Sequence, residues 1–242
     1  NGAGTVRVAG GTTTFSGANT GSANLAVTGG IATFNGTTST SGAATLSGGT
    51  LNGTGTLTLG GPLTLSGTTI SGGILNADGG AAITNNFSFN SGQTLNLAGA
   101  NTWSAGYIYG GGSSVLNNKA GATLTTNFNG TLNGTNYGGG AATTVFNNQG
   151  TFTKSAGTGV TDIGAVFNNP STGVINVQTG TLALGAGGTN SGTVNVSSGA
   201  TLTLDGGSHA FTTGSLINGA GTVRVAGGTT TFSGANTGSA NL

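Results

Sequence analysis

Pairs of adjacent glycines recur along this chain at a nearly constant spacing. The pairs stand at 10–11, 29–30, 48–49, 187–188, 206–207 and 227–228. Four of the pairs are followed, four residues after the second glycine, by a phenylalanine, namely Phe15, Phe34, Phe211 and Phe232. A fixed period of about 20 to 50 residues is typical of solenoids, in which each repeat is one structural unit stacked on the next.

Short runs of alternating apolar and polar residues lie between the glycines. Examples are TVRV at 5–8, TLTL at 56–59 and TLTL at 201–204. Alternation with β-branched residues predicts strands that turn their apolar side inward and threonine outward. Helices are disfavoured because the chain contains 53 glycines, which interrupt every window of helical length.

The runs also match one another at the longer period. Residues 175–177 match 194–196 at a spacing of 19, and 182–184 match 202–204 at a spacing of 20. Equivalent strands one turn apart would pair in parallel about 4.8 Å apart, so that their apolar side chains form a continuous core. We therefore predict an all-β fold, a parallel β-helix (β-solenoid) with about 20 residues and three short strands per coil. Right-handed winding is the default for such connections.

One duplication has no substitution at all, because residues 1–25 return letter for letter at 218–242. Shared fold requirements fix patterns and not identities, so this match indicates a tandem array whose unit is the segment 1–217. We expect residues 1–242 to form one continuous solenoid, with 1–217 as one unit of roughly 11 coils and 218–242 as the start of the next. We expect AVTGGIATFNG to follow Leu242, and end-to-end stacking of chains is the alternative.

Asparagine replaces glycine at a second type of corner. The pattern is VLNN at 115–118 and VFNN at 145–148 and 166–169, each followed by a new strand. Asparagine tolerates the left-handed backbone region, and stacked asparagine side chains can hydrogen-bond in ladders along a fibre axis. We expect such ladders here. The stretch from 76 to 145 is less regular, which predicts longer coils or protruding loops.

The composition excludes several classes of protein. Charged residues make up 3% of the chain, the formal net charge is +1, and there is no cysteine. Disulfides and thiolate metal sites are therefore excluded, and no basic surface for nucleic acid is present. No apolar run reaches the length of a membrane-spanning helix, which is about 20 residues. Compositional disorder would need a high net charge, which this chain lacks.

Catalysis requires titratable groups brought together, and the inventory is short. It consists of Arg7, Asp78, Lys119, Lys154, Asp162, Asp205, His209 and Arg224. Asp205 and His209 flank a Gly-Gly corner next to Ser208, which would complete a nucleophile triad only with an oriented third group and an oxyanion pocket. The simpler interpretation of His209 is a corner residue in the slot of Thr13 and Ala32. We expect no catalytic residues, no metal site and no cofactor.

The sequence resembles a known group of proteins. The phrases GTVxV-xGG-TTTF and FNN-x-GTF are similar to the β-helical regions of large bacterial surface proteins, in particular filamentous-haemagglutinin-like adhesins and autotransporter passenger domains. The resemblance covers nearly the whole chain and implies secretion, an extracellular or cell-surface location and an adhesive or fibrous role. The regularity of the tandem repeat favours a fibre, in which the partner of each unit is another copy of itself.

The aromatic residues Trp103, Tyr107, Tyr109 and Tyr137 are the candidate surface contacts. Alternation around Ile108 places Tyr107 and Tyr109 on one side, where two rings could stack on sugars, seal contacts between fibres or cover a longer loop. A glycan-binding module is therefore one alternative function.

An ice-binding module is the other alternative, because outward Thr-x-Thr pairs resemble those of ice-binding solenoids. The pairs are Thr12/Thr14, Thr56/Thr58, Thr123/Thr125, Thr151/Thr153 and Thr201/Thr203. They fall on different columns, and threonine is also an ordinary residue of solvated strands.

Overall fold

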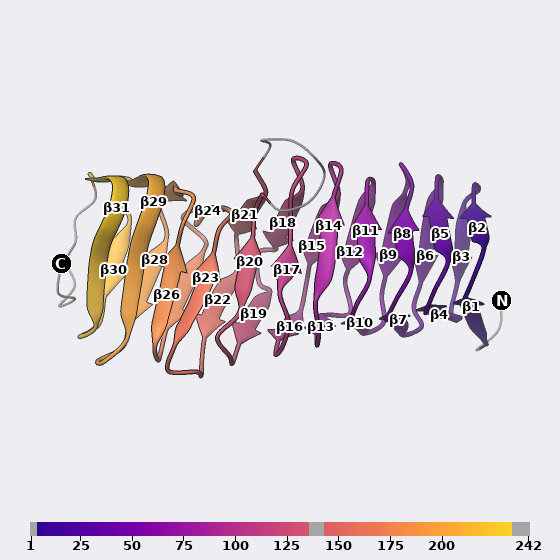
Figure 1. Ribbon diagram of the computed structural model, residues 1–242, viewed down its shortest axis with the longest axis horizontal. Coiled ribbons are helices and arrows are strands. Elements are labelled where there is room, and N and C mark those ends of the chain that lie inside the picture. Colours follow the sequence, from indigo (N-terminus) through magenta and orange to yellow (C-terminus); the bar gives the residue numbers. More distant parts are fainter. Residues whose placement is uncertain (1–3, 136–142, 234–242) are drawn as a thin grey trace.

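The computed structural model describes residues 4–135 and 143–233, and these form a β-solenoid without any helix. The chain advances steadily along one long axis, turn after turn, from the indigo to the yellow end of Figure 1. Three parallel sheets, here named A, B and C, run along this axis, and most turns contribute one short strand to each of them; their strands are counted over the described residues. The length of the coils, their three strands and the eleven turns confirm the fold predicted from the periodicity.

Sheet A has eleven strands, one from every turn, and all its pairs are parallel. The strands follow one another in chain order, so each turn pairs only with the turn before and the turn after it. They are β1 (Thr5–Val8), β4 (Asn24–Val27), β7 (Ala44–Leu46), β10 (Leu63–Leu65), β13 (Ala81–Ile83), β16 (Ala100–Trp103), β19 (Thr123–Thr126), β22 (Thr151–Lys154), β25 (Val174–Val177), β28 (Thr193–Val196) and β30 (Leu216–Asn218).

Sheet B has twelve strands, because the last two turns each form one strand that continues round a corner. Its strands are β2 (Thr12–Phe15), β5 (Ile31–Phe34), β8 (Thr50–Asn52), β11 (Thr69–Ser71), β14 (Phe87–Asn90), β17 (Ile108–Tyr109), β20 (Thr131–Asn133), β23 (Val160–Ile163), β26 (Thr181–Leu184), β27 (Gly188–Asn190), β29 (Thr201–Phe211) and β31 (Thr222–Phe232).

Sheet C has eight strands and closes the third side of each turn. Beyond its last strand the column continues through Asn190, which forms an isolated parallel bridge with Asn169, into the second half of β29. The strands are β3 (Asn19–Gly21), β6 (Thr37–Thr40), β9 (Thr56–Leu59), β12 (Ile74–Ala77), β15 (Thr94–Leu97), β18 (Val115–Asn118), β21 (Val145–Asn148) and β24 (Val166–Asn168).

The observed register follows the sequence columns with one exception. Ile175 pairs with Val194, as the sequence match predicts, and Leu182 pairs with Leu202. The glycine pairs at 187–188 and 206–207 are not in register, however, because Gly188 lies opposite His209. The sequence match, which aligned Gly188 with Gly207, was therefore wrong by two positions. A β-bulge, whose register shifts lie between Leu204 and Ser208 in the pairing of β29 with β31, marks the same corner.

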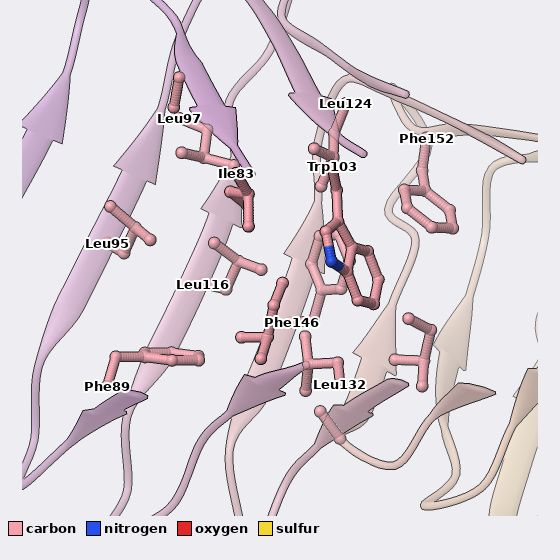
Figure 2. Close-up of a cluster of buried hydrophobic side chains, with 14 of the residues drawn as sticks. Ile83, Phe89, Leu95, Leu97, Trp103, Leu116, Leu124, Leu132, Phe146 and Phe152 are labelled. Atoms are coloured by element: carbon pink, nitrogen blue, oxygen red, sulfur yellow. The ribbon is translucent and has the colours of Figure 1, made fainter. Parts of the chain in front are cut away.

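The core is a column of inward side chains that runs the length of the solenoid. Figure 2 shows its middle part, where side chains from all three sheets meet on the axis. Here Trp103 contacts Phe128 edge to face, with ring centroids 5.4 Å apart, and Phe146 lies 4.7 Å from Phe167. Edge-to-face and stacked aromatic pairs add about 0.5–1.5 kcal/mol each beyond the area that they bury.

Glycine is required at corners where one turn lies directly on the next. Gly30 has a φ of 64°, and a Cβ there would lie 2.6 Å from the carbonyl carbon of Gly10 in the preceding turn. No side chain fits into that gap, and the left-handed φ disfavours one in any case. The corner glycines predicted from the sequence therefore serve both the turn and the close stacking.

The asparagine motifs occupy strand ends and not left-handed corners. Asn117 and Asn118 end β18, while the described non-glycine residues with positive φ are Ser91 and Ser113. The expectation of left-handed asparagine was wrong, because the side-chain amides hydrogen-bond from extended backbone. The expectation of asparagine ladders is confirmed by the side-chain hydrogen bonds described below.

Candidate functional site

Tyr107 and Tyr109 form an aromatic pair on the outer face of sheet B. Ile108 between them is fully buried, so alternation along β17 turns both neighbouring rings outward. The ring centroids are 6.0 Å apart at an angle of 43°, and Tyr107 is 48% exposed. The backbone N–H of Tyr107 donates to Asn86 Oδ1 at 2.6 Å, which fixes the ring-bearing corner to the previous turn.

Two further aromatic residues do not join this pair. Trp103 is only 1% exposed and packs in the core, as Figure 2 shows, so its assignment to a surface contact was wrong. Its indole N–H donates to the carbonyl oxygen of Gly106 at 3.0 Å, which satisfies the polar group of a buried tryptophan. Tyr137 lies outside the described residues. The candidate surface therefore consists of Tyr107 and Tyr109.

A buried ladder of four asparagines runs along the corner between sheets C and A. Asn118 donates to Asn148, Asn148 to Asn169 and Asn169 to Asn190, each at 2.8 Å between Nδ2 and Oδ1. The amides also donate to backbone carbonyls of the following strands, for example Asn148 to Val174 at 2.9 Å. Such a chain satisfies amides that would otherwise be costly to bury, and the aligned dipoles strengthen one another.

The buried ladder ends where its column becomes apolar. Asn118 lies opposite Leu97, and the side-chain oxygen of Asn118 is buried without a hydrogen-bond partner. At the other end Asn190 lies opposite Phe211, and the amide nitrogen of Asn190 is also buried and unpaired. Each unpaired group costs about 1–3 kcal/mol, so the ladder carries a fixed penalty at both ends.

A second ladder follows the outer face of sheet C. It joins Asn76, Asn96, Asn117, Asn147 and Asn168 through side-chain hydrogen bonds of 2.7 to 3.0 Å. Every amide in this ladder donates toward the preceding turn, whereas the three donating amides of the buried ladder, those of Asn118, Asn148 and Asn169, donate toward the following turn. The two ladders therefore run with opposite dipoles along neighbouring positions of the same strands.

Lys154 lies inside the solenoid, a position that was not predicted although the alternation of its strand indicates it. Phe152 points inward in β22, and period two places Lys154 on the same side. The side chain is 0% exposed, and its ammonium group donates to Thr161 Oγ1 at 3.1 Å, Ala156 O at 3.2 Å and Asn129 Oδ1 at 3.3 Å. Burial lowers the pKa of this lysine.

The three residues of the possible triad do not point the same way. His209 is buried within the turn, whereas its neighbours Ser208 and Asp205 are exposed. Burial lowers the pKa of His209, although hydrogen bonds with the backbone of Gly206 and Leu184 act in the opposite direction. His209 pairs with Thr230, the copy of Thr13, and its buried side chain belongs to the long strand β29.

A shallow hollow of about 360 Å³ lies on the outer face of sheet B near this corner, and Asp205 and Arg224 line it together with threonines. Asp162 lies in the same face, in register with Ala183 of the next turn. Burial raises the pKa of Asp162, and the nearby carboxylate of Asp205 raises it further. In the described part of the chain no three His, Cys, Asp or Glu side chains gather as a metal-binding group.

Residues 4–135 and 143–233 include no helix with the length and apolar character that crossing a membrane requires. The Thr-x-Thr pairs are spread over all three sheets, as Thr12, Thr56 and Thr123 illustrate, so they do not form one continuous flat array. Comparison with protein-family models, curated proteins and solved structures found none that matches this chain.

Proposed function

We propose that this chain is a structural protein, in which tandem β-solenoid units stack end to end into an extracellular or cell-surface filament or adhesin stalk. The observation that carries the proposal is the two-sided packing of one repeated segment. Its first copy, Thr5–Phe15, packs against the turn that follows it, and its second copy, Thr222–Phe232, packs against the turn that precedes it.

The contacts on the two sides are equivalent in kind. Phe15 stacks on Phe34 with centroids 4.5 Å apart, and its copy Phe232 stacks on Phe211 at 5.0 Å. The same sequence thus has a fitting partner turn on either edge. A turn with partners on both edges is an interior turn of a longer solenoid, and an unpaired strand edge favours further pairing.

Burial of the equivalent valines supports the same conclusion. Val223 lies opposite Leu202 of the preceding turn and is 2% exposed, whereas its first copy Val6 is 42% exposed. Val8 lies opposite Val27 of the following turn and is buried, whereas its copy Val225 is about half exposed. Covering each exposed valine would contribute about 1 kcal/mol, so a junction between units is stabilised without any residue change.

The mechanism of such a protein is mechanical. Parallel ladders link each turn to the next along three sides, and the asparagine ladders add side-chain hydrogen bonds along the same axis. With 3% charged residues, filaments that lie side by side repel one another little. The resemblance to bacterial surface proteins and the scarcity of reactive groups support a non-enzymatic role outside the cell.

Electron microscopy tests the filament directly. Chains with one, two and three copies of the unit 1–217 should form rods whose length grows by on the order of 50 Å per unit, because each turn advances about 4.8 Å. Particles that remain compact, or whose length does not follow the number of units, contradict the proposal. Antibody labelling of intact source cells tests the location, and label found only after lysis argues against the surface.

Glycan binding is a second candidate function, and the tyrosine pair is the observation that favours it. Two rings 6.0 Å apart on an outer face, one of them 48% exposed, can stack on sugar rings. Tyr107→Ala with Tyr109→Ala should abolish retention on a glycan array if the pair binds sugars, while Tyr107→Phe should preserve it. Equal retention of the parent protein, the double alanine variant and Tyr107→Phe would reject glycan binding and leave the filament proposal unaffected.

A further inference from the structure

The two copies of the repeated segment lie in different sheets of the solenoid. In the first copy, Thr5–Val8 forms β1 of sheet A and Thr12–Phe15 forms β2 of sheet B. In the second copy, the strand at 222–225 extends sheet B beside Leu202 and Leu204. The strand at 229–232 then continues the column of sheet C through its pairing with 208–211, which in turn pairs with 188–190.

The local structure of the two copies is nevertheless the same. Gly11 has a φ of 63° and its copy Gly228 a φ of 68°, so the glycine corner bends alike in both places. Phe15 and Phe232 each stack on the phenylalanine of a neighbouring turn. The sequence thus specifies a strand, a corner and a second strand, but it does not specify which sides of the triangle they occupy.

The number of turns explains the displacement. β1 is the first and β30 the eleventh strand of sheet A, so ten full turns separate them. Asn218, the last residue of β30, is the copy of Asn1, and the next strand of the second copy therefore falls one sheet later. The unit 1–217 fills ten turns plus one side of an eleventh.

We propose that successive units in the array are each rotated by one sheet, about a third of a turn, relative to the unit before. The segment that begins in sheet A of one unit then begins in sheet B of the next and in sheet C of the one after, and the fourth unit returns to sheet A. The inference rests on the proposed tandem filament and deepens it. It specifies the rotation with which the next copy of the unit packs on the last turn of the unit before.

The rotation has a consequence for display along the filament. The Tyr107–Tyr109 pair lies on sheet B of one unit, so it would lie on the sheet C side of the next and on the sheet A side of the third. A filament that binds through this pair would present it on all three sides around its axis. An in-phase array would confine all copies to a single face.

Disulfide trapping tests the register in the protein as it stands, which has no cysteine of its own. Thr201 and Thr222 are neighbours across sheet B in the rotated arrangement. If the copy were in phase, Thr222 would instead lie in sheet A beside Thr193, in the place that Leu216 occupies. Neighbouring parallel strands are about 4.8 Å apart, within the Cα separation that a disulfide spans.

We expect mild oxidation to remove both free thiols from Thr201→Cys/Thr222→Cys and to leave them free in Thr193→Cys/Thr222→Cys, as read by thiol alkylation and mass spectrometry. Ser208→Cys/Thr229→Cys tests the same register at a second position and replaces the first pair if that variant does not fold. A disulfide in Thr193→Cys/Thr222→Cys, or in none of the variants, overturns the rotation.

Disulfide trapping and electron microscopy together separate the two proposals. Rods that lengthen with the number of units, together with the sheet A disulfide, would leave the filament standing and reject only the rotation. Globular particles from multi-unit chains, together with the sheet B disulfide, would reject the filament while the register within one chain held.

Discussion

Asn148 donates its side-chain amide to Asn169 across 2.8 Å, and both side chains are completely enclosed by protein. One residue earlier, Asn147 donates in the opposite direction, to Asn117 at 2.9 Å, from a half-buried position. Neighbouring residues of one strand thus form equivalent hydrogen bonds in a dry and a solvated environment. This contrast makes the solenoid a direct test of what burial adds to a side-chain ladder.

Asn148→Leu should destabilise the protein by about 2 kcal/mol or more, because it removes hydrogen bonds from buried groups that each cost about 1–3 kcal/mol when unpaired. The Asn169 oxygen and the Val174 carbonyl lose their bonds to Asn148, and the Asn118 amide keeps only its bond to the carbonyl oxygen of Thr151. Leucine already occurs in this column at Leu97, so its size is acceptable there. Urea unfolding followed by the fluorescence of the single tryptophan measures the loss.

Asn147→Leu is the matched control for that prediction. Water can replace the lost partners at this half-buried position, so the loss should be about 1 kcal/mol or less. Equal destabilisation by the two variants would mean that burial does not decide the strength of these ladders.

The two glycines Gly11 and Gly30 separate backbone strain from stacking. Both have a φ near 63–64°, but a Cβ at Gly11 would meet no atom within 4 Å, whereas one at Gly30 would lie 2.6 Å from Gly10. Gly11→Ala should cost about 1–2 kcal/mol for the left-handed backbone alone. Gly30→Ala should cost about 1–3 kcal/mol more for the overpacking. Thermal unfolding of the two variants measures both losses. A loss in Gly11→Ala as large as that in Gly30→Ala would contradict the prediction.

His209 should make the protein sensitive to mild acid. Its pKa in the folded state is lowered by burial, so the unfolded chain binds a proton more readily and stability falls as the pH drops below the ordinary value near 6.5. His209→Thr, which inserts the residue found at the equivalent Thr230, should flatten this dependence. Melting temperatures of both proteins between pH 8 and pH 5 provide the measurement, and parallel curves would contradict the prediction.

Lys154 should act at the alkaline end by the same rule. Burial lowers its pKa, so the free energy of unfolding rises as the pH increases toward the ordinary value of 10.5. This gain is lost again as the pH falls toward the folded-state pKa. Lys154→Met should therefore equal or exceed the stability of the parent protein at pH 7, since Thr161 and Asn129 keep hydrogen bonds with Phe128 O and Gly159 N.

The advantage of Lys154→Met should shrink as the pH rises toward 10.5, because the parent lysine then loses the charge that burial disfavours. Lys119→Met serves as a control for the loss of one lysine at a less buried position. A constant difference between Lys154→Met and the parent at every pH would show that the buried amine does not change its protonation in this range.

Much of this architecture was predictable from local pattern. Alternation in 175–177 and 194–196 indicated the strand type and the pairing partner, because one full turn returns each side chain to its own column. The alternation around Ile108 likewise predicted two tyrosines on one outer face. The same rule places Lys154 inside with Phe152, although no position was predicted for this lysine.

Other features depended on contacts between turns. Trp103 is inside because its ring fills the space beside Phe128, in a turn whose long corner the sequence pattern does not fix. Gly188 lies opposite His209 because the corner between Leu204 and His209 holds one residue more than the corner between Leu184 and Gly188, which a match of glycine pairs could not detect.

The sequence by itself determined that this chain is a β-solenoid of repeating turns, since period-two strands within a longer, nearly constant period leave few other ways to bury the apolar residues. Only the tertiary structure decided where the copies sit. Residues 1–25 and 218–242 are identical, yet the strands at 5–8 and 222–225 belong to sheets A and B. The sheet is set by the number of turns that the whole intervening chain completes, and no local sequence encodes that sum.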